Sequence, residues 1–141
     1  MILNKGGGTY IGLGRAACSL VWDKRNDGLS FSQAEVAWTN LPSKATRVFR
    51  HRLNACLPAA EREERIHPTQ KPVPLLEWCL DKVKPCRSVI DPFAGSAATL
   101  IAARNRGIPA VGIERDYEYC RLAAGRLRSS RGTAADLSQA A

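Results

Sequence analysis

No stretch of this 141-residue chain is apolar over the roughly 18 residues that a membrane-spanning helix needs, and nothing resembles a signal peptide. We therefore expect a soluble cytoplasmic protein that does not associate with membranes. The chain has five cysteines, an odd number, and no two of them are spaced as Cys-x-x-Cys. This pattern favours idle thiols in a reducing compartment over disulfides or zinc ligands, so no metal site is expected.

Acidic residues are scarce: 13 aspartates and glutamates oppose 21 lysines and arginines, for a formal net charge of +8. The imbalance favours a polyanionic partner, although many basic proteins never bind nucleic acid. The Gly-x-Gly-x-x-Gly fingerprint is absent, which disfavours a dinucleotide oxidoreductase. Glycines gather in an arm at residues 1–16, but no Gly-Lys-Ser/Thr follows them. We expect this glycine-rich arm to be a linker without a phosphate-binding role.

The most informative stretch holds an apolar run, a glycine turn, a helical pattern and a second apolar run. We predict strands at 88–91 and 109–114, with a helix at 97–106 that is rich in alanine and basic in its last turn. A strand–helix–strand unit of this length pairs its strands in parallel. Each strand ends in an acid, Asp91 or Glu114.

These two acids indicate a nucleotide site. Glu114 lies 23 positions after Asp91, close to the spacing at which an acid after a second strand reaches ribose hydroxyls. Gly95 lets the backbone approach a ligand closely, and the first amides of a helix offer unsatisfied donors. An ordinary strand–helix–strand unit with a capping turn explains the spacing equally well, so the pattern alone leaves both interpretations open.

Three motifs in fixed order carry a family resemblance: His67-Pro-Thr-Gln-Lys-Pro72, Asp91-Pro-Phe-Ala-Gly-Ser96 and Gly112-Ile-Glu114. They resemble the DNA amino-methyltransferases, which methylate adenine N6 or cytosine N4. More narrowly, they resemble the circularly permuted subgroup in which the S-adenosylmethionine half follows the catalytic half. The resemblance implies an α/β fold, the Rossmann-like fold of S-adenosylmethionine-dependent methyltransferases. It also implies a site-specific DNA methyltransferase, as in restriction–modification, with S-adenosylmethionine as cofactor and double-stranded DNA as partner.

The resemblance further implies which residues bind the cofactor. In the family the first motif wraps the methionine end of S-adenosylmethionine, where Lys71 would face the cofactor carboxylate. The cofactor-binding half is expected at residues 67–128. In it the turn at 67–72 should pack beside the loop that follows Asp91, and Asp91, Phe93, Gly95 and Glu114 should line one pocket. The implied cofactor-binding residues are His67, Thr69, Gln70, Lys71, Asp91, Pro92, Phe93, Ala94, Gly95, Ser96, Thr99 and Glu114.

One departure from the family pattern lies inside the cofactor loop. The family usually has Gly-Ser-Gly-Thr/Ser-Thr, whereas this chain has Gly95-Ser96-Ala97-Ala98-Thr99. Ala97 adds a methyl group where glycine permits close approach, and Ala98 removes a hydroxyl group. Ala97 is tolerable if its backbone is already helical. We expect weakened cofactor affinity.

Upstream, residues 17–52 are expected to hold the strand pair of the target-base side. Residues 17–22 and 35–39 are its two strands, and they carry the Trp-Asp-Lys and Ala-Trp-Thr sequences that recur in the permuted family. Trp22 and Trp38 suit either base stacking or packing, and we favour a place in the core.

A basic run interrupted by aromatic residues follows the strand pair. On a DNA-binding surface its arginines, Arg47, Arg50 and Arg52, would contact phosphates and carry little sequence information. An edge strand with a solvated face explains the same run equally well. Residues 53–65 show no clear period and predict a connecting loop. The family that the motifs resemble often places its target-recognition segment near here, and in this chain that segment would be very short, so a dedicated target-recognition domain is not expected.

Two more helices are predicted. The first begins near Pro72, because the N–H that proline lacks is not needed at the start of a helix. It ends at Pro85. Its buried stripe is predicted to be Leu75, Leu76, Cys79, Leu80 and Val83. The second runs over 117–128 with Asp116 as N-cap, and residues 129–141 form a flexible tail. Its inner face is predicted to be Cys120, Ala123, Ala124 and Leu127.

The catalytic tetrad of the family, Asp/Asn/Ser-Pro-Pro-Tyr/Phe, is missing: the only Asp-Pro is Asp91-Pro92, which belongs to the cofactor motif. We assign no catalytic residue and expect the tetrad in an amino-terminal half that precedes residue 1. Without the strands of that half the sheet is incomplete, with unpaired inner edges. Residues 1–141 then form a single partial domain that is inactive alone. A non-catalytic nucleotide- or DNA-binding remnant is the alternative.

Overall fold

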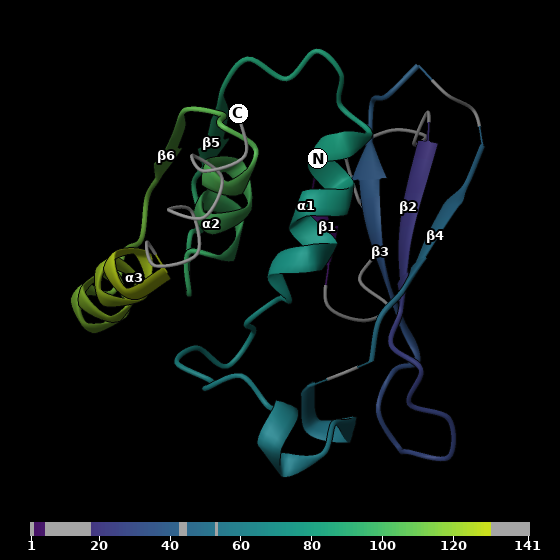
Figure 1. Cartoon of the computed structure of the whole chain (residues 1–141). Helices are drawn as coiled ribbons and strands as arrows, with labels where there is room; N and C mark the ends of the chain where they lie inside the picture. The colour runs from purple at the N-terminus through teal and green to yellow at the C-terminus, as the bar shows by residue number, and fades with distance from the viewer. Residues whose placement is uncertain (1, 5–17, 43–44, 53, 131–141) are drawn as a thin grey trace, which may run out of the picture. The chain divides into compact units, whose positions relative to one another are not determined.

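The structure, a computed structural model, describes residues 2–4, 18–42, 45–52 and 54–130 (Figure 1). The chain divides into two compact units, Met1–Glu63 and Glu64–Ala141. The boundary falls inside the segment that was predicted to be a connecting loop, and the single partial domain stays a prediction. No helix in the described ranges has both the length and the apolar character needed to cross a membrane.

The first unit is built on a four-stranded sheet in the order β1-β3-β2-β4. Strands β2 (Cys18–Asp23) and β3 (Ala34–Thr39) form an antiparallel hairpin, which confirms the two predicted strands. Strand β4 (Arg47–Arg50) pairs in parallel with β2 at the edge of the sheet. The interpretation of the basic run as an edge strand is therefore confirmed, and its arginines are exposed to solvent.

The amino-terminal arm contains a strand that the sequence did not predict. β1 (Ile2–Asn4) pairs antiparallel with β3, so the expectation of a bare linker is wrong for these residues. The edge of β3 that faces away from β2 has backbone N–H and C=O groups that need partners. A three-residue segment can supply these hydrogen bonds even when its own sequence does not favour a strand. The glycine-rich remainder of the predicted arm, residues 5–16, lies outside the described residues.

Alternation along β2 builds the core of this unit. Cys18, Leu20 and Trp22 are buried, as expected for one face of a strand. The Trp22 indole N–H donates to the backbone oxygen of His51 at 2.7 Å, which satisfies its one polar group. Trp38 is the register partner of Ser19, so it lies on the other face of the hairpin, where it is half-buried. The predicted core position is confirmed for Trp22 and holds only in part for Trp38.

Two single-turn 3₁₀ helices, η1 (Asn54–Cys56) and η2 (Ala59–Glu61), interrupt the segment between the basic strand and the His67 motif. The Asn54 side chain links the two ends of this segment by two hydrogen bonds. Its Nδ2 donates to the Glu63 oxygen at 2.9 Å, and its Oδ1 accepts from the Glu63 amide at 3.0 Å. The predicted connecting loop is thus an ordered one.

The second unit contains one strand–helix–strand unit and two further helices. Its elements in chain order are α1 (Val73–Asp81), β5 (Val89–Asp91), α2 (Ala98–Asn105), β6 (Ala110–Gly112) and α3 (Tyr117–Ser129). β5 and β6 pair in parallel, which confirms the prediction for this stretch. A Cβ at Gly112 would lie 2.6 Å from Leu100 Cδ1, so α2 packs directly against β6.

Helix α1 has its N-cap at Pro72, as predicted, but it ends at Asp81 and not at Pro85. The chain tightens after Asp81, because the Val83 amide donates to the oxygen of Leu80, three residues back, at 2.9 Å. The predicted stripe is buried at Leu75, Leu76 and Cys79, and half-buried at Leu80 and Val83. Burial raises the pKa of Cys79 to about 12.

Helix α3 begins as predicted at the N-cap Asp116, whose side chain accepts from the Tyr119 amide at 3.1 Å. On its inner face Ala123 is buried, whereas Ala124 and Leu127 are half-buried. The prediction for Cys120 is wrong, since this side chain is exposed. Helical periodicity places these residues on one side, but only the part around Ala123 is covered.

The two units contribute two separate sheets, and no strand of the described residues joins them. In the two-stranded sheet Ile90 and Val111 are register partners, so they share one face, and both are exposed. Among the described residues this sheet has two strands, and its exposed face is unusual because parallel sheets are ordinarily covered on both faces. The observation agrees with the predicted incomplete sheet of an α/β fold.

Candidate functional site

The candidate site of the second unit lies where β5 and β6 end. The backbone pairing continues beyond the strands, because the Ile113 amide donates to the Asp91 oxygen at 2.8 Å and the Ala94 amide donates to the Ile113 oxygen at 2.9 Å. The loop that follows β5 is therefore tied to the residue that precedes Glu114. This places the two acids that the sequence singled out at one edge of the sheet.

The Glu114 carboxylate bridges two backbone segments. Its Oε2 accepts from the Gly95 amide at 2.9 Å, and its Oε1 accepts from the Asp116 amide at 2.9 Å. These hydrogen bonds, that from Asp116 foremost and that from Gly95 next, hold the pKa of Glu114 below its usual value. The group is therefore an ionised acceptor at neutral pH.

The loop between β5 and α2 is held by its own polar groups. The Asp91 Oδ1 accepts from the Phe93 amide at 3.0 Å. Gly95 has a φ of 50°, a left-handed conformation that suits glycine. The Phe93 ring is 86% exposed, so it makes little packing contribution within the described chain. That Asp91, Phe93, Gly95 and Glu114 line one pocket stays a prediction.

Ala97 differs from the sequence-based expectation. It is the N-cap of α2 and has φ 60° and ψ 21°, so its backbone is left-handed and the helix begins one residue later, at Ala98. The condition for tolerating alanine, a helical backbone, is not met. Ala97 is fully buried and its amide donates to the Ala94 oxygen at 2.8 Å, so the turn imposes this conformation. A side chain in the left-handed region costs about 1–2 kcal/mol.

The His67 motif packs against this loop, as predicted. A Cβ built on Gly95 would lie 3.4 Å from Cε1 and Nδ1 of His67, so the ring fills the space a larger residue would need. The Tyr119 ring meets the imidazole edge-on, with 4.4 Å between centroids. The Thr69 amide donates to His67 Nδ1 at 3.2 Å, so the turn that follows His67 also orients its ring.

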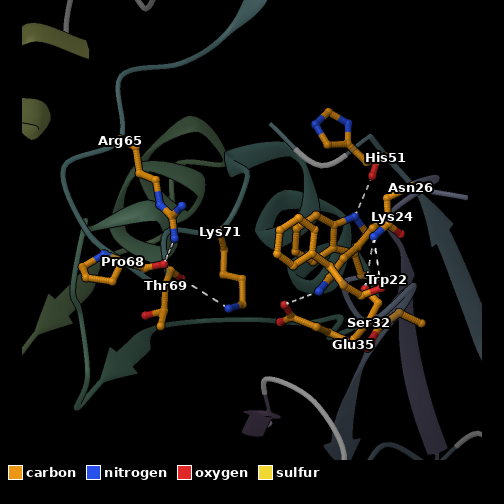
Figure 2. A network of polar contacts seen from close by, with 12 residues as sticks. Trp22, Lys24, Asn26, Ser32, Glu35, His51, Arg65, Pro68, Thr69 and Lys71 are labelled. Atoms are coloured by element: carbon orange, nitrogen blue, oxygen red, sulfur yellow. Dashed lines mark hydrogen bonds and ion pairs between the residues drawn. The ribbon is translucent and has the colours of Figure 1, made fainter. Parts of the chain in front are cut away.

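The remaining polar residues of the motif brace the turn itself. Gln70 Oε1 accepts from the Ile66 amide at 3.1 Å, and its Nε2 donates to the Glu64 oxygen at 3.0 Å. Lys71 Nζ donates to the Thr69 oxygen at 3.2 Å, a contact drawn in Figure 2. These contacts explain the shape of the turn, and a role of Gln70 or Lys71 in cofactor binding stays a prediction.

The other predicted residues of the loop differ in exposure. Ser96 is buried, Ala94 and Thr99 are half-buried, and Pro92 is exposed. Arg126 of α3, which the sequence reasoning missed, donates through Nη1 to the Ser96 backbone oxygen at 3.0 Å and to its Oγ at 3.3 Å. No spacing or motif relates a residue near the end of α3 to this loop, so the sequence offered no signal for it.

The three predicted DNA-contacting arginines belong to the first unit. Arg47 pairs in register with Leu20 and Arg50 with Asp23, so the two arginines point to opposite faces of β4. Arg52 is exposed beyond the end of the strand. Arg50 Nε lies 3.4 Å from Asp23 Oδ2. The three side chains therefore do not form a single face.

A buried ion pair joins Lys24, the residue after β2, to Glu35 of β3 (Figure 2). Lys24 Nζ is 3.0 Å from Glu35 Oε1, with only 7% and 4% of the side chains exposed. Lys24 Nζ also lies 5.5 Å from the centroid of the Trp22 ring. Within the described ranges no group of three or more His, Cys, Asp or Glu side chains is placed to hold a metal ion.

Comparison with known proteins adds a family assignment. A family profile described as DNA methylase matches residues 16–125. The chain is 40% identical over 68 residues to the Type II methyltransferase M2.DpnII of Streptococcus pneumoniae, and likewise to the Type II methyltransferase M.ScaI of Streptomyces caespitosus. Each alignment covers 48% of this chain, but only 25% and 22% of the respective relative. The chain thus spans about a quarter of the length of these relatives.

A solved structure shows the fold. The crystal structure of the M1.HpyAVI–SAM complex matches with a TM-score of 0.55 and 24% sequence identity, over 77% of this chain and 60% of that chain. The match establishes a methyltransferase-like α/β fold for the described chain, which confirms the predicted fold class.

Proposed function

The chain belongs to the N6/N4 DNA methylase family, and from this premise we propose that its second unit binds S-adenosylmethionine for methyl transfer to adenine N6 or cytosine N4 of double-stranded DNA. The observation that carries this proposal is the Glu114 carboxylate at the end of β6, held by the amides of Gly95 and Asp116. An ionised acid fixed beside a glycine turn is the arrangement that binds ribose hydroxyls in nucleotide-binding folds.

The residues present fit such a cofactor. Each Glu114 oxygen accepts one backbone N–H, and a carboxylate oxygen has a second lone pair for a ribose hydroxyl. Gly95 has no side chain, and the His67 ring lies where a Cβ at this position would point. When bound, S-adenosylmethionine supplies the sulfonium methyl group.

We assign the cofactor-holding residues to two groups. Asp91, Phe93, Gly95 and Glu114 hold the nucleoside end through the turn between β5 and α2. The motif that begins at His67 holds the methionine end. The other cofactor-holding residues are Thr69, Gln70, Lys71, Pro92, Ala94, Ser96 and Thr99. Lys71 is the cation of the second group and faces the cofactor carboxylate.

The first unit supports a role on the DNA side. Arg47, Arg50 and Arg52 are exposed, and the chain carries a formal net charge of +8. We propose that these arginines contact phosphates, which position DNA without reading its sequence. Arg47 and Arg50 lie on opposite faces of β4, so we do not propose that they bind phosphates as one continuous surface.

We propose that methyl transfer needs a further segment that carries the catalytic tetrad. The 141 residues contain no Pro-Pro sequence, so the rigid turn that aims a carboxylate and a ring at the flipped base is missing. Transfer requires the target amine in line with the methyl group, and phosphate contacts do not orient a base. This missing turn also supports the second candidate function, a remnant that binds nucleotide or DNA without catalysis.

Titration calorimetry with S-adenosylmethionine tests the cofactor proposal. We expect Glu114→Ala to lose roughly 1–3 kcal/mol of binding free energy, because a hydrogen-bonded charged acceptor is removed. Glu118→Ala is the matched control: Glu118 is an exposed acid four residues on, paired with Arg121 on the surface of α3. Equal affinity for all three proteins, or no binding by the unmodified chain, would overturn the assignment.

Transfer of labelled methyl groups to mixed-sequence duplex DNA separates the two candidate functions. The purified chain is expected to incorporate no more label than a heat-treated control. Addition of an upstream segment that carries the tetrad, fused or in trans, should start incorporation if the chain is part of an enzyme. Continued inactivity of that complete assembly would favour the non-catalytic remnant.

A further inference from the structure

Helix α3 contacts both parts of the proposed cofactor site through one of its faces. Tyr119, Ala123 and Arg126 follow one another at helical spacing, so they lie on the same side of the helix. The Tyr119 ring meets the His67 ring edge-on, with 4.4 Å between centroids. Ala123 is buried, and Arg126 donates to Ser96. The face therefore reaches the His67 motif at one end and the turn between β5 and α2 at the other.

The contact of Arg126 is made to the peptide group that joins Ser96 to Ala97 within the glycine turn, residues 92–97. Arg126 Nη1 donates to the oxygen of this group at 3.0 Å. The N–H of the same group, that of Ala97, donates to the Ala94 oxygen at 2.8 Å. Both polar ends of one peptide group are thus held, and its rotation would break both hydrogen bonds. The group is also shielded from solvent, because Ser96 is 4% exposed and Ala97 is fully buried.

The orientation of this peptide group sets the backbone conformation of Ala97. Ala97 has a φ of 60°, and it would regain an ordinary negative φ if the group turned over. The local backbone energy therefore favours rotation, and within the turn the hydrogen bond to Ala94 opposes it. Arg126 adds a charged donor, and such hydrogen bonds are roughly twice as strong as neutral ones. The balance between the two orientations thus depends on α3.

We propose that Arg126 is a positioning residue for the cofactor, which fixes the peptide group between Ser96 and Ala97 in the orientation that binds S-adenosylmethionine. The same turn carries the Gly95 amide, which donates to Glu114 Oε2 at 2.9 Å, so a rotated peptide group also disturbs the backbone beside this acid. In this role Arg126 acts through Ser96 and need not touch the cofactor. The inference rests on the proposed function for the identity of the ligand.

Calorimetric titration of the full chain with S-adenosylmethionine tests this role. The variants are Arg126→Met, Ala97→Gly, the double variant with both substitutions, and Arg104→Met. Arg104 is the matched control, an arginine of α2 that donates to the Leu127 oxygen at 2.7 Å and to Ser130 Oγ at 2.6 Å at the end of α3. Its substitution removes the same charge and a comparable link to α3, but outside the glycine turn. Urea unfolding gives the folded fraction of each variant.

We expect Arg126→Met to weaken S-adenosylmethionine binding roughly tenfold, because the binding-competent turn is then present in only about a tenth of the molecules. Arg104→Met should also lose stability but keep the affinity of the unmodified chain. Ala97→Gly alone should bind normally, because glycine adopts the left-handed conformation without strain. In the double variant this glycine removes the reason for rotation, so affinity should return to within about twofold of the unmodified chain. If Arg126→Met does not fold, Arg126→Lys replaces it, and its single ammonium donor should give a smaller loss that Ala97→Gly also rescues.

Amide hydrogen exchange at Ala97, followed by NMR, reports the turn without any cofactor. The Ala97 N–H is bonded to the Ala94 oxygen in the observed orientation, and rotation of the peptide group would break this bond. Exchange at Ala97 should therefore accelerate in Arg126→Met and stay unchanged in Arg104→Met, because only the first variant frees the turn to open locally.

The outcomes separate this inference from the proposed function. Normal affinity in Arg126→Met, an equal loss in Arg104→Met, or a double variant as weak as Arg126→Met would each overturn the inference and keep the cofactor proposal. Failure of the unmodified chain to bind S-adenosylmethionine overturns the cofactor proposal instead, and exchange at Ala97 then decides whether Arg126 holds the turn. Unchanged exchange at Ala97 in Arg126→Met overturns the inference in either case.

Discussion

The backbone N–H of Gly95 donates to the carboxylate of Glu114, with 2.9 Å between N and Oε2, although 19 positions separate the two residues. This hydrogen bond ties the turn after β5 to Glu114, two residues beyond the end of β6. The acid therefore supports the loop that is proposed to hold the cofactor, in addition to its own proposed contact with ribose. Substitutions on either side of this bond should affect both stability and binding.

The stability of the second unit should depend on pH through Glu114. Amide hydrogen bonds from Asp116 and Gly95 lower its pKa below the usual 4.5 in the folded state. A group with a depressed folded pKa contributes stability above its unfolded pKa and loses it as pH falls through the folded value. Thermal unfolding should show that Glu114→Gln flattens the loss of stability below about pH 4.5. Glu118→Gln is the control, and an unchanged acid profile in Glu114→Gln would contradict the prediction.

Gly95→Ala should destabilise the chain more than Gly107→Ala. Both glycines have left-handed φ values, 50° and 66°, so each substitution carries backbone strain of about 1–2 kcal/mol. Only at Gly95 does the new methyl group also meet the His67 ring, at 3.4 Å, the short limit of ordinary van der Waals contact, so the additional loss at Gly95 measures how far the ring must shift. Nothing lies within 4 Å at Gly107. Urea unfolding of the two variants isolates this contact. Equal destabilisation would show that the His67 ring yields without cost.

Ala97→Gly should cost less stability than Ala98→Gly. Both alanines are buried, so each substitution removes a buried methyl group. Ala98 is helical and loses about 1 kcal/mol of helix propensity on change to glycine. Ala97 has a φ of 60°, so glycine there relieves left-handed strain of about 1–2 kcal/mol. Chemical denaturation compares the two, and a larger loss for Ala97→Gly would refute the strain argument.

Lys24→Met should destabilise the first unit by several kcal/mol, on the order of the 3–5 kcal/mol found when one partner of a buried ion pair is removed. The control is Arg121→Met in the pair of Arg121 with Glu118, which has the same 3.0 Å separation but side chains that are 60% and 65% exposed. That loss should stay below about 1 kcal/mol. The two free energies of unfolding are compared by urea titration. Similar losses would show that burial of the Lys24 pair is unimportant.

Much of the second unit was predictable because its signals are local. The parallel pairing of β5 and β6, the N-cap Asp116 and the helix start at Pro72 follow from turn residues, capping chemistry and apolar periodicity. The contact of the His67 motif with Gly95 was predicted through the family resemblance and is confirmed by the structure.

Other features depend on residues that are distant in the sequence. The strand at Ile2–Asn4 forms because β3 offers an open edge, and no local pattern announces that edge. The exposure of Cys120 depends on what covers α3, which a helical period does not specify.

The sequence by itself determined the order of the elements from α1 to α3, the acids that follow β5 and β6, and the family, because these follow from residue type and spacing. Only the tertiary structure decided that Ala97 is left-handed, that Arg126 holds Ser96 and that Glu114 bridges two amides. Each of these depends on where the chain closes on itself. A backbone dihedral or a hydrogen bond between remote residues is set by the sum of surrounding contacts, and no single residue or motif encodes that sum.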